Sequence, residues 1–426
     1  MRMGVEEYRA FDNTMKADIT DLDTGLPVSL WVTSYLRNFE GAGSTVLSEA
    51  YQLKFVIEYF ESESIDLIDR VESGGFLTEV EQDAFFHICR YKKGSIIMKD
   101  NKGATQHRFT RKTIDNMIHA TTYSKANVSL HTTRVRLTAF RRFAEHLFRY
   151  IHARPGNRVP GDLKYNYDCL ISDIKDEIEG LSDDNDVVKD VFEQAIATDN
   201  YFKLLEVIKP THADNPWSKL TRFRNNIILQ LFIETGNRLG AICKLKISDL
   251  RDDTNFRILV TRTPHDPADS RKRAPATKVL AHSSSISREL MKQINLYIST
   301  DRTQYTKSTT HDFLFVSHKG KTAGEPLGTR SVTTIVSDLS QVINEHIHPH
   351  LLRHKWNEIF SEKAEKLGYT PEKIEDMRKF ACGWTDNSSM SGVYNAFRHA
   401  LTVQKISAQE QSKFIPINVV NTSSVK

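Results

Sequence analysis

The sequence predicts a mainly α-helical protein with one small β-hairpin, an α+β fold divided into two domains. Its 426 residues exceed one ordinary domain and suffice for two or three. Most apolar residues recur at helical spacing, and strand-like composition is confined to residues 256–263 and 277–281. No apolar run approaches the roughly 20 residues of a membrane-spanning helix. The acidic N-terminus lacks the apolar stretch of a signal peptide, which predicts a cytoplasmic protein without a membrane partner.

The first domain is predicted to be a small helical bundle over residues 27–160. Residues 1–26 are polar and acidic, and they are expected to form an N-terminal arm. Apolar residues at helical spacing then predict one helix from Leu30 and a second after the glycine-rich break at residues 41–45. A further helix is expected to begin at Thr78, because Glu79 and Glu81 favour the positive end of a helix dipole.

A basic amphipathic helix closes this domain. Its apolar residues between Val135 and Ile151 approximate one helical stripe, and arginines surround that stripe. The candidates for contact with a polyanion such as DNA are Arg134, Arg136, Arg141 and Arg142. The alternative is an ordinary solvated helix.

Charge is distributed in blocks, although the net charge is only +4. Residues 1–90 hold 7 bases and 17 acids, residues 91–160 hold 15 and 3, residues 161–200 hold 3 and 12, and residues 201–426 hold 33 and 22. Two basic blocks separated by an acidic one indicate two surfaces that meet the same polyanion. Residues 161–204 are therefore predicted to be an acidic linker.

The second domain, over residues 205–402, mixes helices with the hairpin. Trp217 to Thr235 is predicted to be a helix that ends at Gly236. The two strand-like stretches follow and enclose a long loop rich in proline and basic residues. Residues 403–426 are expected to form a C-terminal tail that docks onto a neighbouring protomer or remains disordered.

Four local patterns in the second domain carry chemistry. Arg238 follows the helix stop at Gly236 and is held in a turn. His350, Arg353 and His354 share one helical face, because they stand at positions i, i+3 and i+4. The other two patterns are Gly383-Trp384 with Tyr394 further along, and the basic loop with Arg271, Lys272, Arg273 and, on the returning strand, Lys278.

In this order the patterns resemble the tyrosine recombinases, the phage integrase family. That family has T-G-x-R, a lysine on a β-hairpin, H-x-x-R-H, G-H or G-W, and a final tyrosine. The resemblance covers roughly residues 205–400 and implies a helical core-binding domain followed by a catalytic domain. Tyr394 would be the nucleophile and Arg238 and Arg353 would bind the phosphate. His350 would accept a proton and Lys272 would donate one, with Lys278 as the second choice.

The resemblance also implies that Trp384 is catalytic and that His354 and Lys278 are supporting residues. His354 and Trp384 would hydrogen-bond to the phosphate or pack against it, and Arg271 and Arg273 would contact DNA. This chain departs from the family at Ala241, where an acidic residue is usual, in a longer interval before Tyr394 and in a longer hairpin loop. Alignment of the strands places Arg262 or Pro264 near the usual lysine position, so the choice of Lys272 rests on its chemistry and its place in the loop.

The implied function is site-specific DNA recombination or integration for a mobile element through a 3′-phosphotyrosyl intermediate. The implied partners are double-stranded DNA, three further copies of the chain in a tetrameric synapse, and an accessory directionality or DNA-bending protein. No cofactor or metal is expected. The alternatives are DNA relaxation or hairpin resolution by the same site, a DNA-binding regulator that cleaves nothing, and a metal site built from His346, His348, His350 and His354.

Overall fold

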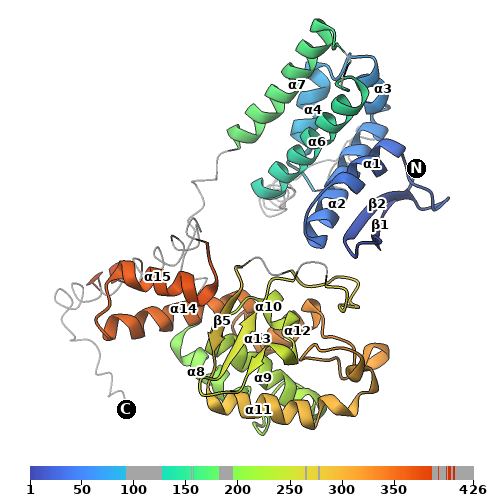
Figure 1. The fold of residues 1–426 in the computed structure, drawn as a ribbon. Helices are drawn as coiled ribbons and strands as arrows, with labels where there is room; N and C mark the ends of the chain where they lie inside the picture. The colour runs from blue at the N-terminus through green and yellow to red at the C-terminus, as the bar shows by residue number, and fades with distance from the viewer. Residues whose placement is uncertain are drawn as a thin grey trace, which may run out of the picture. The chain divides into compact units, whose positions relative to one another are not determined.

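The computed structural model describes residues 1–92, 127–181 and 195–385, apart from residues 155, 157, 264–265 and 277–278, together with a few positions between residues 392 and 407. The chain divides into two units, Met1–Val188 and Lys189–Lys426 (Figure 1). Within the described ranges, no helix is long and apolar enough to cross a membrane. The division falls inside the segment 161–204 that was predicted to be a linker.

The first unit consists of one β-hairpin and a set of helices. These elements are β1 (Met3–Arg9), β2 (Met15–Asp21), α1 (Leu30–Asn38), α2 (Gly43–Ser62), α3 (Leu67–Glu72), α4 (Glu79–Ile88), α6 (Leu130–Ile151) and α7 (Gly161–Gly180). The helix expected at Thr78 is confirmed: Thr78 caps α4, its hydroxyl accepts from the backbone N–H of Glu81, and the Glu81 carboxylate accepts from the N–H of Thr78.

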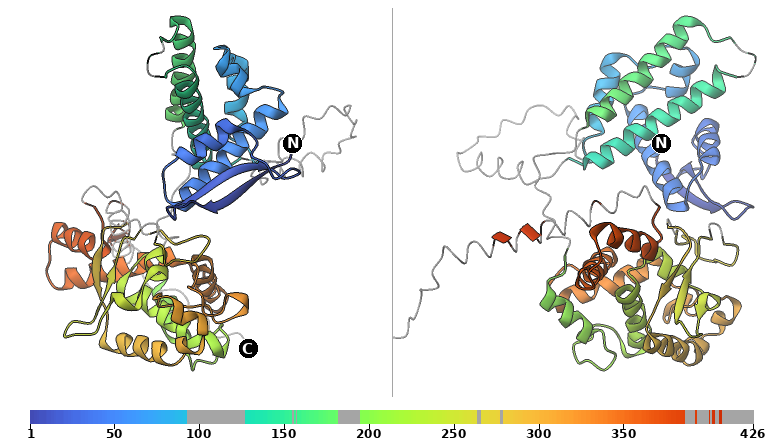
Figure 2. Two further views of the ribbon diagram at one scale, coloured as in Figure 1. Left: turned by 45° about the vertical axis from the view of Figure 1, so that its right-hand side comes forward. Right: turned by 60° about the vertical axis from the view of Figure 1, so that its left-hand side comes forward.

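Residues 1–26 differ from the expected arm, because most of them form the hairpin β1–β2. The two strands pair antiparallel from Met3 opposite Asp21 to Arg9 opposite Met15, and both contact α2 (Figure 2). Met3, Ala17 and Ile19 are buried in the core of the first unit. Short strands carry few apolar residues, and the acids on the remaining positions obscured their alternation in the sequence.

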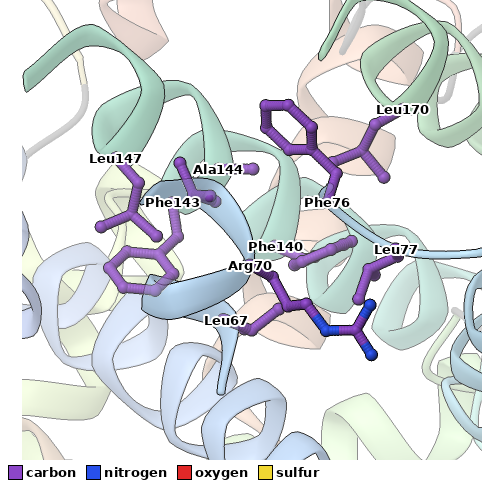
Figure 3. Close-up of a pocket in the computed structure, with 10 residues that line it drawn as sticks. Leu67, Arg70, Phe76, Leu77, Phe140, Phe143, Ala144, Leu147 and Leu170 are labelled. Carbon is purple, nitrogen blue, oxygen red and sulfur yellow. The ribbon is translucent and has the colours of Figure 1, made fainter. Parts of the chain in front are cut away.

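The core of the first unit lies between α2, α4, α6 and α7. Phe140 and Phe143 of α6 are each 2% exposed, and Leu170 of α7 is 3% exposed. Figure 3 shows these side chains around a narrow apolar pocket with residues of α3 and the loop after it. Helix α7 covers residues 161–180, so the first part of the predicted linker belongs instead to this core.

The second unit combines helices with a three-stranded antiparallel sheet in the order β3-β4-β5. Its strands are β3 (Leu250–Arg251), β4 (Arg257–Val260) and β5 (His282–Ser285). Its helices are α8 (Thr198–Val207), α9 (Lys219–Thr235), α10 (Leu239–Lys244), α11 (Arg288–Ser299), α12 (Thr329–Ser337), α13 (Leu339–Ile343), α14 (Pro349–Lys366) and α15 (Pro371–Cys382). The first strand of the predicted hairpin is confirmed as β4, whereas the returning strand β5 begins after residue 281.

Helix α9 runs through the centre of this unit. Ile227, Ile228, Leu231 and Phe232 are all 0% exposed, and α11 and α14 pack against the helix. The helix is enclosed on several sides, and its buried residues also include Arg224, Asn225 and Asn226. The end of α9 therefore offers a rigid base for the residues that follow it.

Candidate active site

The end of α9 fixes the turn that carries Arg238. Gly236 has the left-handed backbone angles φ 59° and ψ 18°, and its N–H donates to the carbonyl of Phe232 at 3.0 Å. A Cβ at this position would lie 2.6 Å from Trp356 Cδ2, so only glycine fits. The chain then enters α10, with Arg238 as its first flanking residue. The predicted helix stop is confirmed.

Helix α14 brings Arg353 against the same turn. Arg353 is 1% exposed, and its Nη1 donates to the carbonyl oxygen of Gly236 at 2.5 Å. Within the described part of the chain, Arg353 Nε and Nη2 are buried and have no hydrogen-bond partner. A buried guanidinium with two unused donors is unusual, because desolvation of a charge is costly unless its donors are satisfied. These two donors suit an anionic oxygen of a ligand.

Two imidazoles stand on the same face of α14. The rings of His350 and His354 are 4.6 Å apart and meet edge to face. Burial and then the charges of Arg353, His348 and Arg238 hold the pKa of His350 below its usual value. Burial and then His350 lower the pKa of His354 to about 4. His350 is therefore neutral near pH 7, which is the form that accepts a proton.

The positive charges of Arg238 and Arg353 act on the same titratable groups, Cys382 and His350. Burial raises the pKa of the Cys382 thiol, while the guanidinium groups of Arg353, Arg238 and Arg378 oppose that rise. Arg238 and Arg353 also both lower the pKa of His350. The structure thus assembles two predicted arginines from separate motifs into one electropositive site.

The turn after α15 supplies the next motif. Gly383 ends the helix with a left-handed φ of 60°, and its carbonyl accepts from the N–H of Leu280 at 2.8 Å. Trp384 follows and is 5% exposed, with its ring centroid 5.4 Å from the guanidinium carbon of Arg353. Trp384 therefore packs against Arg353, and its predicted role as a catalytic residue at the phosphate stays a prediction.

Ala241 explains part of the departure from the family pattern. Its methyl group belongs to a small apolar cluster with Val260, Val279, Cys382 and Trp384. In this chain the position packs against Trp384 instead of holding an acid.

The predicted loop residues divide into a structural one and exposed ones. Arg271 does not face solvent: its guanidinium pairs with the Asp269 carboxylate and donates to the carbonyls of Cys243 at 2.8 Å and Leu327 at 2.7 Å. Arg271 therefore anchors the loop, which corrects its prediction as a DNA contact. Lys272 and Arg273 are exposed. Among the described residues Lys272 has no hydrogen bond or ion pair that ties it to the two arginines.

Lys278 and Tyr394 lie outside the described residues, as does most of the tail 403–426. Their assignments remain predictions from the sequence. For the alternative of a metal site, the described ranges contain no group of three or more His, Cys, Asp or Glu side chains that could hold a metal ion.

Among the four predicted DNA-contacting arginines of α6, Arg136 is buried. Arg136 is 8% exposed and donates to the carbonyls of Cys89 at 2.9 Å and Tyr91 at 2.7 Å. Its guanidinium also lies 3.9 Å from the centroid of the Phe55 ring. Arg136 thus ties α6 to the end of α4, which corrects its prediction as a DNA contact.

The other three arginines of α6 lie nearer the surface, each with a partner. Arg134 donates to the backbone carbonyl that follows α7 at 2.8 Å. Arg141 pairs with Glu145 at 2.8 Å and Arg142 pairs with Glu49 at 3.2 Å. The Arg141–Glu145 pair is a surface ion pair and contributes little energy, whereas the Glu49 carboxylate that pairs with Arg142 is 4% exposed.

Sequence reasoning missed three residues beside the site. Asn237 lies in the arginine turn, His282 begins β5, and Arg378 of α15 is 1% exposed. Burial and the charges of Arg353 and Arg238 lower the pKa of His282, which places it beside both arginines. No local sequence signal marks His282, because strands separated by a long loop bring it to the site.

Comparison with known proteins agrees with these motifs. Residues 195–396 match the model of the phage integrase family. This segment of the chain is therefore similar to the phage integrase family, the tyrosine recombinases.

Transposase A from transposon Tn554 of Staphylococcus aureus is 28% identical over 131 residues, which are 31% of this chain and 34% of the relative. The match therefore spans about a third of the length of that relative. Among solved structures, the XerH recombinase in its post-cleavage complex with difH aligns with a TM-score of 0.46 at 19% identity, over 71% of this chain and 74% of that chain. A lambda integrase dimer bound to a core site aligns with a TM-score of 0.33 at 14% identity, over 92% and 95%.

Proposed function

We propose that this chain is a site-specific DNA recombinase that cleaves and rejoins DNA strands through a 3′-phosphotyrosyl intermediate. The observation that carries the proposal is the buried Arg353 guanidinium, whose Nε and Nη2 have no partner in the described ranges, beside Arg238, His350 and Trp384. An electropositive, largely buried site with unused planar donors fits a phosphodiester.

The two arginines act on the charge that develops at phosphorus. Arg353 and Arg238 donate to the non-bridging oxygens of the scissile phosphate, where the pentacoordinate transition state gathers negative charge. Guanidinium serves this purpose better than ammonium, because its fork presents two parallel donors to two oxygens. The contact of Arg353 with the carbonyl of Gly236 fixes the fork before substrate binds.

Proton transfer falls to the imidazole and a hairpin lysine. Tyr394 attacks phosphorus and passes its proton to His350, which the site keeps neutral. The leaving 5′ oxygen takes a proton from Lys272, with Lys278 as the second candidate for this general acid. Strand joining reverses these steps, since the phosphotyrosyl bond conserves the energy of the broken linkage.

We assign the assembly and setting by the same reasoning. Double-stranded DNA is the substrate, a tetramer of this chain forms the synapse, and an accessory protein sets direction. Similarity to a transposon transposase supports integration or excision of a mobile element. The proposal places the reaction in the cytoplasm.

Recovery of covalent protein–DNA adducts tests the proposal. The full chain is incubated with fragmented genomic DNA in the presence of EDTA and then denatured, and any attached DNA is sequenced. Wild type is expected to retain DNA with a recurrent sequence, and Tyr394→Phe is expected to retain none. If both proteins bind DNA and neither forms an adduct, the chain is a DNA-binding regulator and the proposed cleavage is wrong.

A further inference from the structure

His282 occupies the junction of three elements that the proposed reaction requires. It is the first residue of β5, where it pairs with Val260 of β4. Its Nδ1 lies 2.9 Å from the carbonyl oxygen of Leu280, and its Nε2 lies 3.2 Å from Asn237 Oδ1. A Cβ on Gly383 would lie 2.4 Å from His282 Nδ1, so the ring rests directly on the turn before Trp384.

Asn237 is the partner that links this histidine to the arginine turn. It is the residue between Gly236 and Arg238, and it is 2% exposed. Its backbone N–H donates to the Thr235 hydroxyl at 3.2 Å, and its amide Nδ2 donates to Ser284 Oγ at 3.1 Å. Asn237 therefore contacts two residues on the same side of β5, since His282 and Ser284 are two positions apart.

The hydrogen bonding of the imidazole defines one consistent arrangement. Both ring nitrogens face oxygen atoms, whereas a neutral imidazole has one donor and one acceptor. Burial and the charges of Arg353 and Arg238 lower the pKa of His282, and the hydrogen bond to the Leu280 carbonyl only partly opposes this effect. The ring is therefore neutral near pH 7. Asn237 Oδ1 is the acceptor that faces His282 Nε2, while Asn237 Nδ2 donates to Ser284 Oγ, so His282 and Ser284 hold the amide from both ends.

We infer that His282 is a positioning residue for Arg238, acting through Asn237 to hold the arginine turn against β5 and the Gly383–Trp384 turn. This inference rests on the proposed function. The Asn237–His282 bridge joins the T-G-x-R turn, the hairpin and the G-W turn, whose side chains must meet one phosphate. A displacement of about 1 Å in such a group costs roughly 10²-fold in rate.

Single-turnover cleavage by the full chain tests the bridge. The substrate is a nicked duplex with the sequence recovered from wild-type adducts, at saturating protein. His282→Leu is expected to lower the cleavage rate roughly 10²-fold and to leave DNA affinity within about twofold. His282→Gln, which can place an amide N–H near the Nε2 position and donate to Asn237 Oδ1, is expected to recover most of that rate. Ser283→Ala, at an exposed position of the same strand, is the matched control and is expected to cleave like wild type.

A double-mutant cycle separates positioning from general support of the fold. In an Arg238→Ala background, His282→Leu is expected to cause no further loss of rate, because its effect passes through Arg238. An equal loss in both backgrounds, or wild-type cleavage by His282→Leu, would overturn the inference while leaving the proposed function intact. Absence of cleavage by wild type itself would overturn both.

Discussion

Arg353 provides a test that separates function from stability. It is 1% exposed, yet within the described ranges the one hydrogen bond of its guanidinium runs from Nη1 to the carbonyl of Gly236. A buried guanidinium with two unsatisfied donors pays a desolvation cost that its remaining contacts do not repay. In the proposed function, Arg353 binds the phosphate and lowers the unfolding free energy while no phosphate is bound.

Arg353→Met keeps the length of the side chain and removes the charge. The variant loses one hydrogen bond to a charged group, worth about 1.5–3 kcal/mol, and gains by removing an unpaired buried charge of comparable or larger cost. The unfolding free energy of the second unit is thus expected to change by no more than about 1.5 kcal/mol in either direction. Its neighbour Leu352, also 1% exposed, gives the contrast: Leu352→Ala is expected to lose about 2–5 kcal/mol.

The cleavage rate is expected to fall more in Arg353→Met than in Leu352→Ala, although Leu352→Ala loses more stability. Loss of a donor to the charged transition state lowers the rate about 10²–10³-fold, so Arg353→Met should be nearly inactive while folded. The assay pairs urea denaturation, in which Leu352→Ala identifies the transition of the second unit, with single-turnover cleavage at saturating DNA. Loss of more than about 4 kcal/mol of stability in Arg353→Met, or wild-type cleavage by this variant, would refute the reasoning.

Three further predictions follow from individual contacts. Burial and the Arg353 charge lower the pKa of His350, so the cleavage rate should fall with decreasing pH only below about pH 6.5. A midpoint of the pH–rate profile above that value, or the same acid limb of the profile in His350→Gln, contradicts this prediction. The folded state keeps the pKa of His354 at about 4. The stability that depends on neutral His354 is therefore complete above the unfolded pKa of about 6.5 and is lost as pH falls toward 4. The urea midpoint should decline between these two pH values, and it should decline less in His354→Gln. Arg136→Met should destabilise the first unit by about 1–3 kcal/mol, because two carbonyls lose a charged donor. The same variant should leave the salt dependence of DNA binding unchanged. A weaker salt dependence of DNA binding with unchanged stability would show that Arg136 contacts a phosphate instead.

Much of the second unit could be predicted because its signals are local. The stop of α9 at Gly236 follows from one glycine after a strongly apolar helix, and the shared face of His350, Arg353 and His354 follows from helical spacing alone. The start of α4 at Thr78 follows from its cap residues. Each of these features depends on residues within a few positions of one another.

The remaining features depend on contacts between distant residues. The hairpin β1–β2 escaped prediction because its buried residues are few and become recognisable only against α1 and α2. Arg136 and Arg271 look like surface arginines in the sequence, but carbonyls 45 and 56 positions away accept their hydrogen bonds. His282 reaches Asn237 across 45 positions and has no motif of its own.

The residue that becomes covalently joined to DNA identifies the nucleophile of the proposed cleavage. Adducts formed by the full chain in EDTA are digested with nuclease and protease, and the nucleotide-bearing peptide is sequenced by mass spectrometry. We expect a single modified residue, Tyr394, joined to a nucleotide through its 3′ phosphate. A nucleotide on any other residue, or a linkage through a 5′ phosphate, would contradict the assignment of Tyr394 as the nucleophile and of the 5′ oxygen as the leaving group.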